Sequence, residues 1–228
     1  MATTQKMPTV VKTRSPAVKI IIARLEKVHP DAKLDLNFTN PLELLIALIL
    51  AAQARDDLVN KVTANLFEVY RTAADYANLP LEKLESQVSK INFYRNKAKS
   101  IHNCCRELVE RFGGKVPDDL KHLVSLPGVG RKTANIMLGN SFGHNTIGVD
   151  THVMRLSQRL GFTKKTDPDK IEAELMAIVP EKQRVRFCHL MQYHGRRVCL
   201  AKKPRCPECT IKDLCPFSRK TTNEFKRK

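Results

Sequence analysis

The sequence contains no tryptophan, and aromatic residues make up only 6% of its 228 positions. Proteins that hold single-stranded nucleic acid by stacking bases need several aromatic side chains, so this binding mode is disfavoured. The longest apolar run, 44–54, is interrupted by Gln53 and falls short of the ~20 residues that a membrane-spanning helix needs. The polar start of the chain lacks the apolar stretch of a secretory signal. We therefore expect a cytoplasmic protein.

Acidic residues are also scarce relative to basic ones. The chain has 40 Lys and Arg against 23 Asp and Glu, a formal net charge of +17, and its hydrophobic content of 42% allows a packed core. A strong positive charge favours a polyanionic partner, and nucleic acid comes first because bound phosphates release counterions. A merely basic, soluble or ribosome-associated protein is the alternative that charge alone leaves open.

Alternating strand patterns are missing as well. Apolar residues recur at helical spacing, and prolines follow capping residues at Ser15-Pro16 and Asn40-Pro41, which is typical of helix starts. Short connections between helices predict an all-α fold. The predicted helices cover 16–28, 41–53, 56–71, 81–88, 95–112, 118–123, 131–141, 151–160, 169–179 and 183–200.

Four of the seven cysteines fall close together near the end of the sequence, with the spacing C-x6-C-x2-C-x5-C. Cytoplasmic proteins rarely form disulfides, so a metal site is the better explanation. Four thiolates suit tetrahedral zinc or a [4Fe–4S] cluster, and the wide outer spacing favours the cluster without excluding zinc. The ligands would be Cys199, Cys206, Cys209 and Cys215. We expect Cys104, Cys105 and Cys188 to be ordinary buried residues.

The stretch 183–205 contains seven basic residues and no acidic one. They are Arg184, Arg186, Arg196, Arg197, Lys202, Lys203 and Arg205. A metal-bound loop could hold such cations against a phosphate backbone, which lowers the ordering cost of binding. The alternative is a solvated face. The lack of any interleaved acid favours binding.

A glycine-containing hairpin, Leu-Pro-Gly-Val-Gly-Arg-Lys at 126–132, lies between two predicted helices. We expect Gly128 and Gly130 to adopt positive φ and to let the backbone approach a ligand. The following helix start would direct its free N–H groups at phosphate. A tight interhelical turn is the alternative. Taken alone, Lys132 suggests a phosphate contact and Asp150 a helix N-cap.

Together, these motifs resemble the helix-hairpin-helix DNA glycosylases, and among them most closely the bacterial endonuclease III family. The resemblance rests on LPGVGRKTAN at 126–135, VDTHV at 149–153, HGRRVC at 194–199 and the cysteine loop, in this order. It implies a [4Fe–4S] cluster and two helical lobes that flank a DNA-binding cleft. One lobe would be a six-helix bundle over 34–145, with the helix-hairpin-helix at about 118–141. The other would combine 1–33 with 146–228 and carry the cluster loop.

The resemblance also implies a reaction. The protein would be a bifunctional DNA glycosylase and AP lyase of base excision repair that removes oxidised pyrimidines from duplex DNA. Lys132 matches the nucleophile that forms a Schiff base before β-elimination, and Asp150 matches the essential carboxylate. Adenine glycosylases of this type lack the lysine, and their usual C-terminal domain is not expected after Cys215. The branch acting on 8-oxoguanine typically lacks the cysteine loop.

DNA contacts are likewise implied by the resemblance. Gln53 would fill the hole left by the flipped nucleotide, and Phe93 would be an apolar wedge. A polar helix end and a core aromatic are the alternatives. The further DNA-binding residues are Gly128, Gly130, Arg131, His152, Arg196, Lys202, Lys203 and Arg205.

Two positions depart from the family pattern. Asn92 stands where glycine is common, and we expect it to tolerate the positive φ of that turn. Arg55 stands where threonine or serine is usual; it would alter lesion preference or pair with Asp56.

The predicted partner is duplex DNA with oxidised pyrimidines or abasic sites, with no membrane partner, and the protein is expected to be a nucleoid-associated monomer. A non-catalytic DNA-binding module with a redox-sensing cluster and a glycosylase for another lesion are the competing hypotheses.

Overall fold

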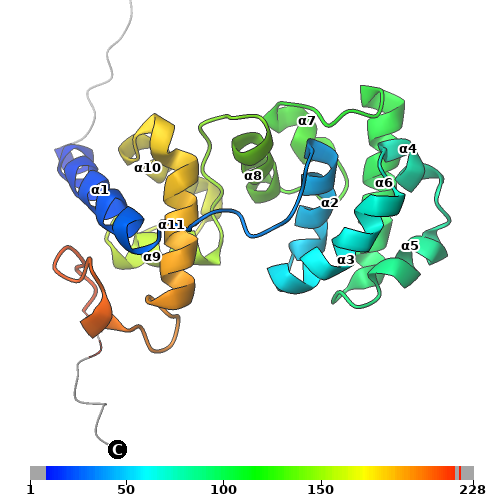
Figure 1. Ribbon diagram of the computed structural model, residues 1–228. Helices are drawn as coiled ribbons and strands as arrows, with labels where there is room; N and C mark the ends of the chain where they lie inside the picture. The colour runs from blue at the N-terminus through cyan, green and yellow to red at the C-terminus, as the bar shows by residue number, and fades with distance from the viewer. Residues whose placement is uncertain (1–8, 219–220, 222–228) are drawn as a thin grey trace, which may run out of the picture. The chain divides into compact units, whose positions relative to one another are not determined.

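The computed structural model describes residues 9–218 and residue 221. These residues form eleven α-helices, two short 3-10 helices and no strand, which confirms the predicted all-α class. Two compact units are present: unit 1 takes in the described parts of Met1–Lys33 and Asn145–Lys228, and unit 2 is Leu34–His144. Unit 2 contains α2 (Pro41–Ala51), α3 (Asp56–Val69), α4 (Ala73–Asn78), α5 (Leu81–Val88), α6 (Tyr94–Phe112), α7 (Leu120–Ser125) and α8 (Arg131–Ser141) (Figure 1).

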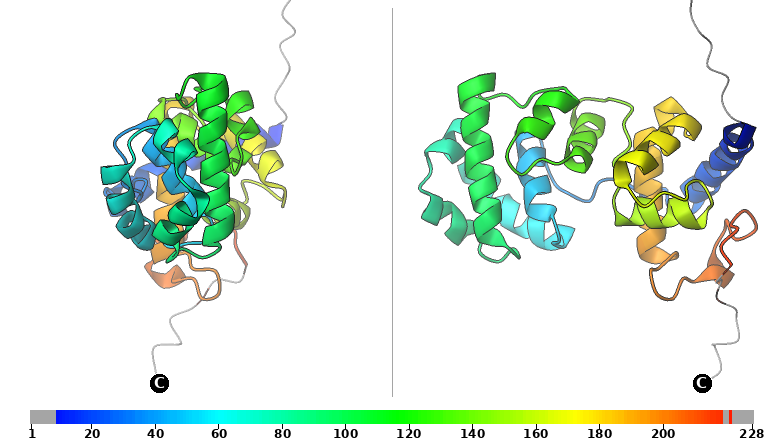
Figure 2. Two further views of the ribbon diagram at one scale, coloured as in Figure 1. Left: turned by 90° about the vertical axis from the view of Figure 1, so that its right-hand side faces the viewer. Right: turned by 180° about the vertical axis from the view of Figure 1, so that it is seen from behind.

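The almost wholly apolar helix α2 forms the centre of unit 2. It packs against α3, α6 and α8, as the opposite views in Figures 1 and 2 show. Asn40 caps its start, because the side-chain oxygen accepts a hydrogen bond from the Glu43 N–H at 3.0 Å. Leu44, Leu45 and Leu50 are fully buried, and each contributes about 1.5–3 kcal/mol by leaving water.

The second layer of unit 2 is a pair of helices that includes one the sequence pattern did not predict. The short helix α4 packs along the long helix α6. Its start is a capping box: the Thr72 hydroxyl accepts from the Asp75 N–H, and the Asp75 carboxylate accepts from the Thr72 N–H. The Thr-x-x-Asp spacing at 72–75 is the signal that could have revealed this helix.

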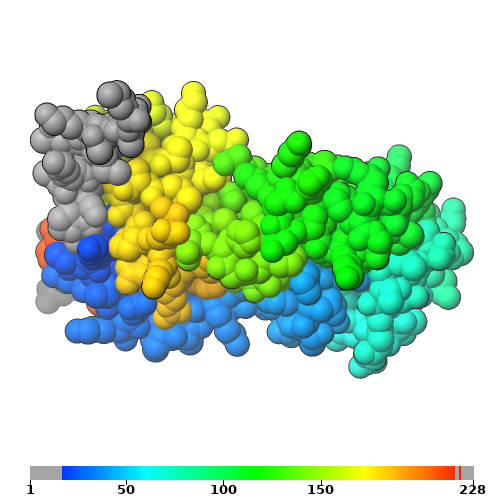
Figure 3. Space-filling model, turned by 90° about the horizontal axis from the view of Figure 1, so that it is seen from above, coloured from blue at the N-terminus to red at the C-terminus, as the bar shows by residue number. Residues whose placement is uncertain are grey.

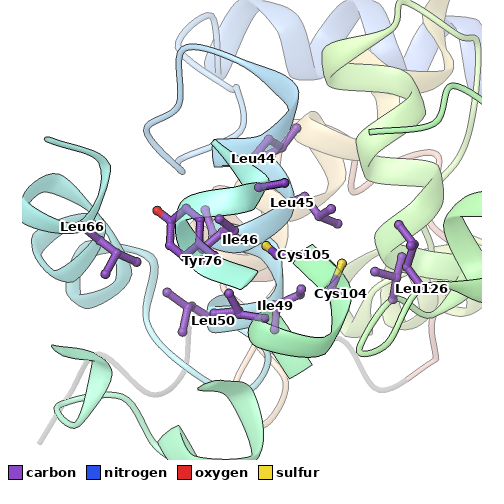
Figure 4. Packing of buried hydrophobic residues seen from close by; sticks show 14 of the residues in the cluster. Leu44, Leu45, Ile46, Ile49, Leu50, Leu66, Tyr76, Cys104, Cys105 and Leu126 are labelled. Carbon is purple, nitrogen blue, oxygen red and sulfur yellow. The ribbon is translucent and has the colours of Figure 1, made fainter. Parts of the chain in front are cut away.

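Two of the cysteines outside the loop lie in this core. Cys104 and Cys105 are each 1% exposed on α6, and Figure 4 shows them among leucine, isoleucine and tyrosine side chains of unit 2. Burial raises the pKa of the Cys104 thiol to about 12, so it stays protonated at neutral pH. Cys188 is buried in unit 1. The prediction that these three are ordinary core residues is confirmed.

Unit 1 is built from α1 (Thr9–Val28), α9 (Thr151–Arg159), α10 (Pro168–Ile178) and α11 (Arg184–Arg197), with 3-10 turns at Glu181–Gln183 and Cys206–Glu208. Helix α11 packs on α9 and α1, and α10 packs on α1. Leu25, Leu156 and Phe187 are among the side chains that close this core. The unit therefore joins the first helix of the sequence to its last helix and the cysteine loop.

Several helix ends differ from the predictions. Helix α1 begins at Thr9 and runs through Ser15-Pro16, so the predicted start at this proline is wrong, although a proline inside a helix removes one backbone hydrogen bond. Helix α2 ends at Ala51, before Gln53, and α11 ends at Arg197. Of the amino-terminal residues, 1–8 lie outside the described part of the chain.

Among the described residues, none of the helices has the length and apolar content needed to cross a bilayer.

The space-filling view in Figure 3 shows one face of the protein, on which residues around position 120, coloured bright green, lie at the surface of unit 2. This segment leads directly into the predicted hairpin.

Candidate active site and cysteine loop

The glycine hairpin joins α7 to α8 within unit 2. The Val129 N–H donates to the Leu126 carbonyl at 3.1 Å and closes the turn. Gly128 has φ of +80°, and a Cβ placed on it would lie 2.8 Å from Ser100 Cβ, so a side chain here would be strained and would clash. Gly130 has φ of −86°, so the expectation of positive φ at this position is wrong. Only the first of the two glycines is needed for the turn.

Helix α8 begins directly after the hairpin, and its start presents cations. Its N-cap residue, Gly130, supplies no side-chain hydrogen bond to the first turn. Arg131 and Lys132 are both exposed, whereas Ala134 and Met137 bury the opposite face in the core of unit 2. The apolar face of α8 thus fixes the helix and leaves the Lys132 amine accessible.

Asp150 lies in unit 1 and caps α9. Its Oδ1 accepts a hydrogen bond from the Val153 N–H at 2.7 Å, and the residue is half-buried. A carboxylate at a helix N-terminus is also stabilised by the helix dipole, so the negative charge is held in place at low cost. The cap predicted from the sequence is therefore present, and it fixes the direction of the carboxylate.

His152 is the second residue after that cap, in the first turn of α9, and lies beside Gly195 of α11. Arg155 Nη2 is 3.2 Å from His152 Nδ1, and the same guanidinium donates to the Gly195 and Cys199 carbonyls. Since a guanidinium only donates, Nδ1 accepts, and the neutral ring carries its proton on Nε2. Burial lowers the pKa of His152 and so favours this neutral form. A Cβ placed on Gly195 would lie 2.6 Å from Nδ1, so glycine is required there.

Gln53 and Phe93 share an uncommon backbone conformation. Within the described residues they are the two non-glycine positions with positive φ, 55° and 59°. A side chain in this region costs about 1–2 kcal/mol, so the surrounding contacts must hold both turns. Phe93 precedes α6 and is 63% exposed, so the core-aromatic alternative is excluded. Asn92 was expected to take the positive φ of this turn, and that is wrong because Phe93 takes it.

Arg55, the other departure from the family pattern, is exposed and forms a bidentate ion pair. Its Nε and Nη2 donate to the two carboxylate oxygens of Asp57 at 2.9 and 2.8 Å. The Arg55 guanidinium holds the pKa of Asp57 below its usual range. The expected ion pair was with the neighbouring Asp56. Pairing with Asp57 ties Arg55 to the first turn of α3.

The four cysteines of the loop line one pocket in unit 1. Its volume is about 330 Å³, part of which is open to solvent. Within the described residues, no three His, Cys, Asp or Glu side chains are close enough to hold a single metal ion. The remaining lining residues are Arg159, Val198, Pro204, Arg205, Lys212 and Phe217.

Polar groups around this pocket point at the sulfurs. Arg159 Nη1 donates to Cys199 Sγ at 3.2 Å, and His194 Nε2 lies 3.4 Å from Cys209 Sγ. His194 Nδ1 in turn lies 3.1 Å from His29 Nε2. Burial lowers the pKa of His194 to about 4, so the ring is neutral and can donate from one nitrogen only. These donors suit sulfurs that carry negative charge. Arg159 and His194 are residues that the sequence analysis did not single out.

The basic stretch 183–205 divides into two groups. Arg184 donates to the Asn145 and Met176 carbonyls, Arg186 to the Ala32 carbonyl, and Arg197 pairs with Asp31. These three arginines hold unit 1 together. The side chains of the second group are exposed. They are Arg196, Lys202, Lys203 and Arg205.

Comparison with known proteins assigns the chain to a family. Residues 46–181 match the model of the HhH-GPD superfamily of base excision DNA repair proteins. Endonuclease III of Synechocystis sp. is 47% identical over 197 residues, which cover 86% of this chain and 90% of that protein. The chain belongs to the endonuclease III family.

Other members support the assignment. Endonuclease III of Escherichia coli K12 is 43% identical over 200 residues, covering 88% of this chain and 95% of that protein. A solved structure described as a trapped endonuclease III–DNA covalent intermediate matches with a TM-score of 0.84 and 45% identity, covering 89% of this chain and 95% of that one. The predicted family and activity class are confirmed: this endonuclease III family member is a base excision repair DNA glycosylase and AP lyase.

Proposed function

We propose that this enzyme removes oxidised pyrimidines from duplex DNA with Lys132 as nucleophile and Asp150 as the assisting carboxylate. The observation that carries the proposal is the exposed Lys132 amine in the first turn of the hairpin helix, in a chain 45% identical to a protein trapped as a covalent intermediate with DNA. An amine is the side-chain nucleophile that forms a Schiff base with a sugar aldehyde carbon.

The reaction proceeds in two stages. The damaged base is out of reach inside the stack, so the nucleotide is first extruded into the active site. The lone pair of Lys132 Nζ attacks C1′ of the deoxyribose, the C1′–N bond breaks, and the departing base takes a proton from the attacking amine. The C1′–O4′ bond then breaks, O4′ takes a proton from solvent, and a protonated Schiff base between Nζ and C1′ remains.

The Schiff base makes strand cleavage possible. Its positive nitrogen acidifies the C2′ proton, whose loss to a base expels the phosphate from C3′ by β-elimination. Water then hydrolyses the C1′–Nζ bond and returns the free amine. The Asp150 carboxylate would stabilise positive charge that develops on the sugar and assist proton transfer. Its N-cap bond at 2.7 Å fixes one oxygen and leaves the second for this role.

Duplex DNA would be bound by two kinds of contact. The hairpin backbone and the uncapped start of α8 suit a phosphate, with Gly128, Gly130 and Arg131 beside it. Exposed cations of the second basic group, Arg196, Lys202, Lys203 and Arg205, suit further phosphates. Gln53 and Phe93 would enter the base stack, and the Nε2–H of His152 would donate a hydrogen bond.

A [4Fe–4S] cluster fits the chemistry of the cysteine pocket. All four thiols line the pocket, and Arg159 and His194 have side-chain nitrogens within hydrogen-bond reach of Cys199 Sγ and Cys209 Sγ. A cubane cluster binds one thiolate at each of its four iron corners, which matches four cysteines around one pocket. Cys199, Cys206, Cys209 and Cys215 would hold the cluster. When bound, it would cross-link the loop and fix Lys202, Lys203 and Arg205 in place.

Borohydride trapping on a duplex that contains thymine glycol tests the proposed function. The protein is expected to form a stable adduct and to nick the strand, whereas Lys132→Ala forms none. Lys170→Ala is the matched control, because Lys170 is an exposed lysine in the first turn of another helix, α10. Equal trapping by Lys132→Ala and the parent protein would exclude Lys132 as nucleophile.

Cleavage of a panel of duplexes, each with a different lesion, measures the lesion preference. We expect oxidised pyrimidines to be processed faster than uracil or 8-oxoguanine in otherwise identical strands. Preference for a different lesion would support the competing glycosylase hypothesis, and binding without any cleavage would support the non-catalytic module. We expect the activity to take place in the cytoplasm, on the nucleoid, because the proposed substrate is duplex DNA and the similar endonuclease III proteins are bacterial.

A further inference from the structure

A buried lysine connects the two strained turns of unit 2. Lys97 lies in the first turn of α6 and is only 6% exposed. Its Nζ donates to the Leu50 carbonyl at 2.8 Å and to the Ala52 carbonyl at 2.6 Å. Its backbone N–H donates to the Phe93 carbonyl at 3.1 Å. The last bond is the regular backbone bond of the first helical turn, whereas the two Nζ bonds belong to the lysine side chain. The side chain therefore ties the chain immediately before Gln53 to the helix turn that begins directly after Phe93.

The electrostatics of the site explain why a lysine is placed there. Carbonyls at a helix C-terminus have no partner within the helix and carry partial negative charge. Helix α2 has no basic residue in its own last turn. The Lys97 ammonium, which extends from α6, supplies this hydrogen-bond donor. It bonds to the Leu50 carbonyl in the last turn of α2 and to the carbonyl of the C-cap residue, Ala52. Only 6% of Lys97 is exposed, so the site is largely closed to water, and this burial lowers the pKa of Lys97.

The same region also touches the glycine hairpin. A Cβ placed on Gly128 would lie 2.8 Å from Ser100 Cβ and 3.7 Å from Ile49 Cγ2. Ser100 is about one helical turn beyond Lys97, and Ile49 directly precedes Leu50. The end of α2, the start of α6 and the hairpin are thus in contact around Lys97.

We propose that Lys97 is a positioning residue that locks the Gln53 turn and the Phe93 turn into one rigid element for opening the duplex. The proposal rests on the proposed function, in which these two side chains enter the base stack. Both side chains must occupy the base stack while the nucleotide is extruded. If the two turns are already fixed in the free protein, little conformational entropy is lost when the side chains enter the DNA. Lys97 would therefore affect the opening of the duplex and leave the chemistry at C1′ unchanged.

The test compares a duplex with a single strand. A single-stranded oligonucleotide with an abasic site has no opposite strand to separate and no hole to fill. Lys97→Met keeps the length of the side chain and removes the two hydrogen bonds that Nζ donates to Leu50 and Ala52. We expect its single-turnover rate on a thymine-glycol duplex to fall about 10-fold to 100-fold, as for other losses of positioning. Its lyase rate on the single strand should stay within about twofold of the parent rate.

Lys99→Met is the matched control, because Lys99 is an exposed lysine on the same helix and the substitution is identical. It should retain both rates. If Lys97→Met behaves like Lys99→Met on the duplex, the proposal is wrong. If Lys97→Met loses both rates equally, Lys97 has a merely structural role, and the proposal is wrong in that case too.

A double-mutant cycle covers the case in which Lys97→Met does not fold. Lys97→Gln keeps a neutral hydrogen-bond donor at this position. Its duplex activity should fall less than that of the Gln53→Ala, Phe93→Ala double variant, which lacks both side chains that enter the base stack. In a Gln53→Ala, Phe93→Ala background, Lys97→Gln should cause no further loss, because it acts through those residues. Full additivity would contradict the proposal. Failure of the proposed function is distinguishable, since the parent protein would then form no borohydride adduct on either substrate.

Discussion

At the scale of single residues, Asp150 combines a structural role with a chemical one. The carboxylate caps α9 through the Val153 N–H and would also stabilise charge on the sugar. These roles require different properties: the cap needs an oxygen acceptor, whereas the chemistry needs a negative charge. A substitution that keeps the acceptor and removes the charge therefore separates them.

Asp150→Asn should leave the free energy of unfolding within about 0.5 kcal/mol of the parent value, because asparagine is as good an N-cap as aspartate. Its single-turnover glycosylase rate should nevertheless fall about 100-fold or more, within the range of general acid–base and electrostatic contributions. Asp150→Ala should lose the same activity and also about 1 kcal/mol of stability. Chemical denaturation and quenched-flow cleavage measure the two effects. A fully active Asp150→Asn enzyme would show that Asp150 is only a cap.

His152 gives a pH-dependent prediction at the same scale. Burial lowers the pKa of His152, and the Arg155 guanidinium lowers it further, while the Asp150 carboxylate raises it. Because the unfolded chain binds the proton at higher pH than the folded one, the stability that His152 contributes is present above about pH 6.5 and is lost on acidification. The free energy of unfolding should therefore fall less between about pH 7.5 and about pH 5 for His152→Gln than for the parent protein. Identical pH profiles would refute this explanation, and an NMR titration of the ring gives an independent check.

At the scale of secondary-structure elements, the hairpin needs glycine at one position and not at the other. Gly128→Ala places a Cβ at positive φ and within 2.8 Å of Ser100 Cβ. It should lower the free energy of unfolding by about 1–3 kcal/mol. At Gly130, φ is −86° and no atom lies within 4 Å of an added Cβ. Gly130→Ala should therefore stay within about 0.5 kcal/mol of the parent stability.

Gly130→Ala nevertheless should weaken duplex binding, because the methyl group would stand between the start of α8 and the phosphate. Thermal melts and fluorescence-anisotropy titrations on the two variants separate the effects. Equal melting points for Gly128→Ala and Gly130→Ala would contradict the account of the turn, and parent-like binding by Gly130→Ala would remove this glycine from the DNA contacts.

The helices that could be predicted from the sequence are those with strong local signals. The ranges 81–88 and 131–141 coincide with α5 and α8, because proline or glycine precedes each start and the apolar spacing is regular. The prediction for α2 extended two residues too far, since Ala52 has a non-helical ψ of 113° and Gln53 a left-handed φ, at a helix end whose carbonyls accept hydrogen bonds from Lys97. Helix α4 was missed because it is only six residues long, too short for a repeating helical pattern of apolar residues. Local patterns thus located the helices, whereas long-range contacts decided where they end.

At the scale of the whole molecule, the proposed chemistry and the cysteine loop depend on residues far apart in the sequence. His29 reaches Cys209 through His194, and Arg24 pairs with Asp213 at 2.6 Å, so the first helix holds the cysteine loop. The motifs predicted the ligand set, but the supporting residues carry no spacing signal. Whether Cys199, Cys206, Cys209 and Cys215 bind the cluster stays a prediction.

Replacement of single cysteines tests that prediction. Cys206→Ser should yield protein with little iron and without the brown colour of the parent, because a serine oxygen is a poor ligand for a cluster built on thiolates. Cys188→Ala, which changes a buried cysteine of the same unit, should keep both iron and colour. Equal amounts of iron and sulfide in the purified parent protein would support the cluster. A colourless parent protein loaded with zinc would contradict it.

The proposed reaction depends on a covalent bond between Lys132 and the sugar. Mass spectrometry of peptides from the borohydride-trapped complex with a thymine-glycol duplex detects that bond directly. We expect a single modified peptide, with the reduced sugar on Nζ of Lys132. Modification of another lysine or of the N-terminal amine, with Lys132 unmodified, would contradict it.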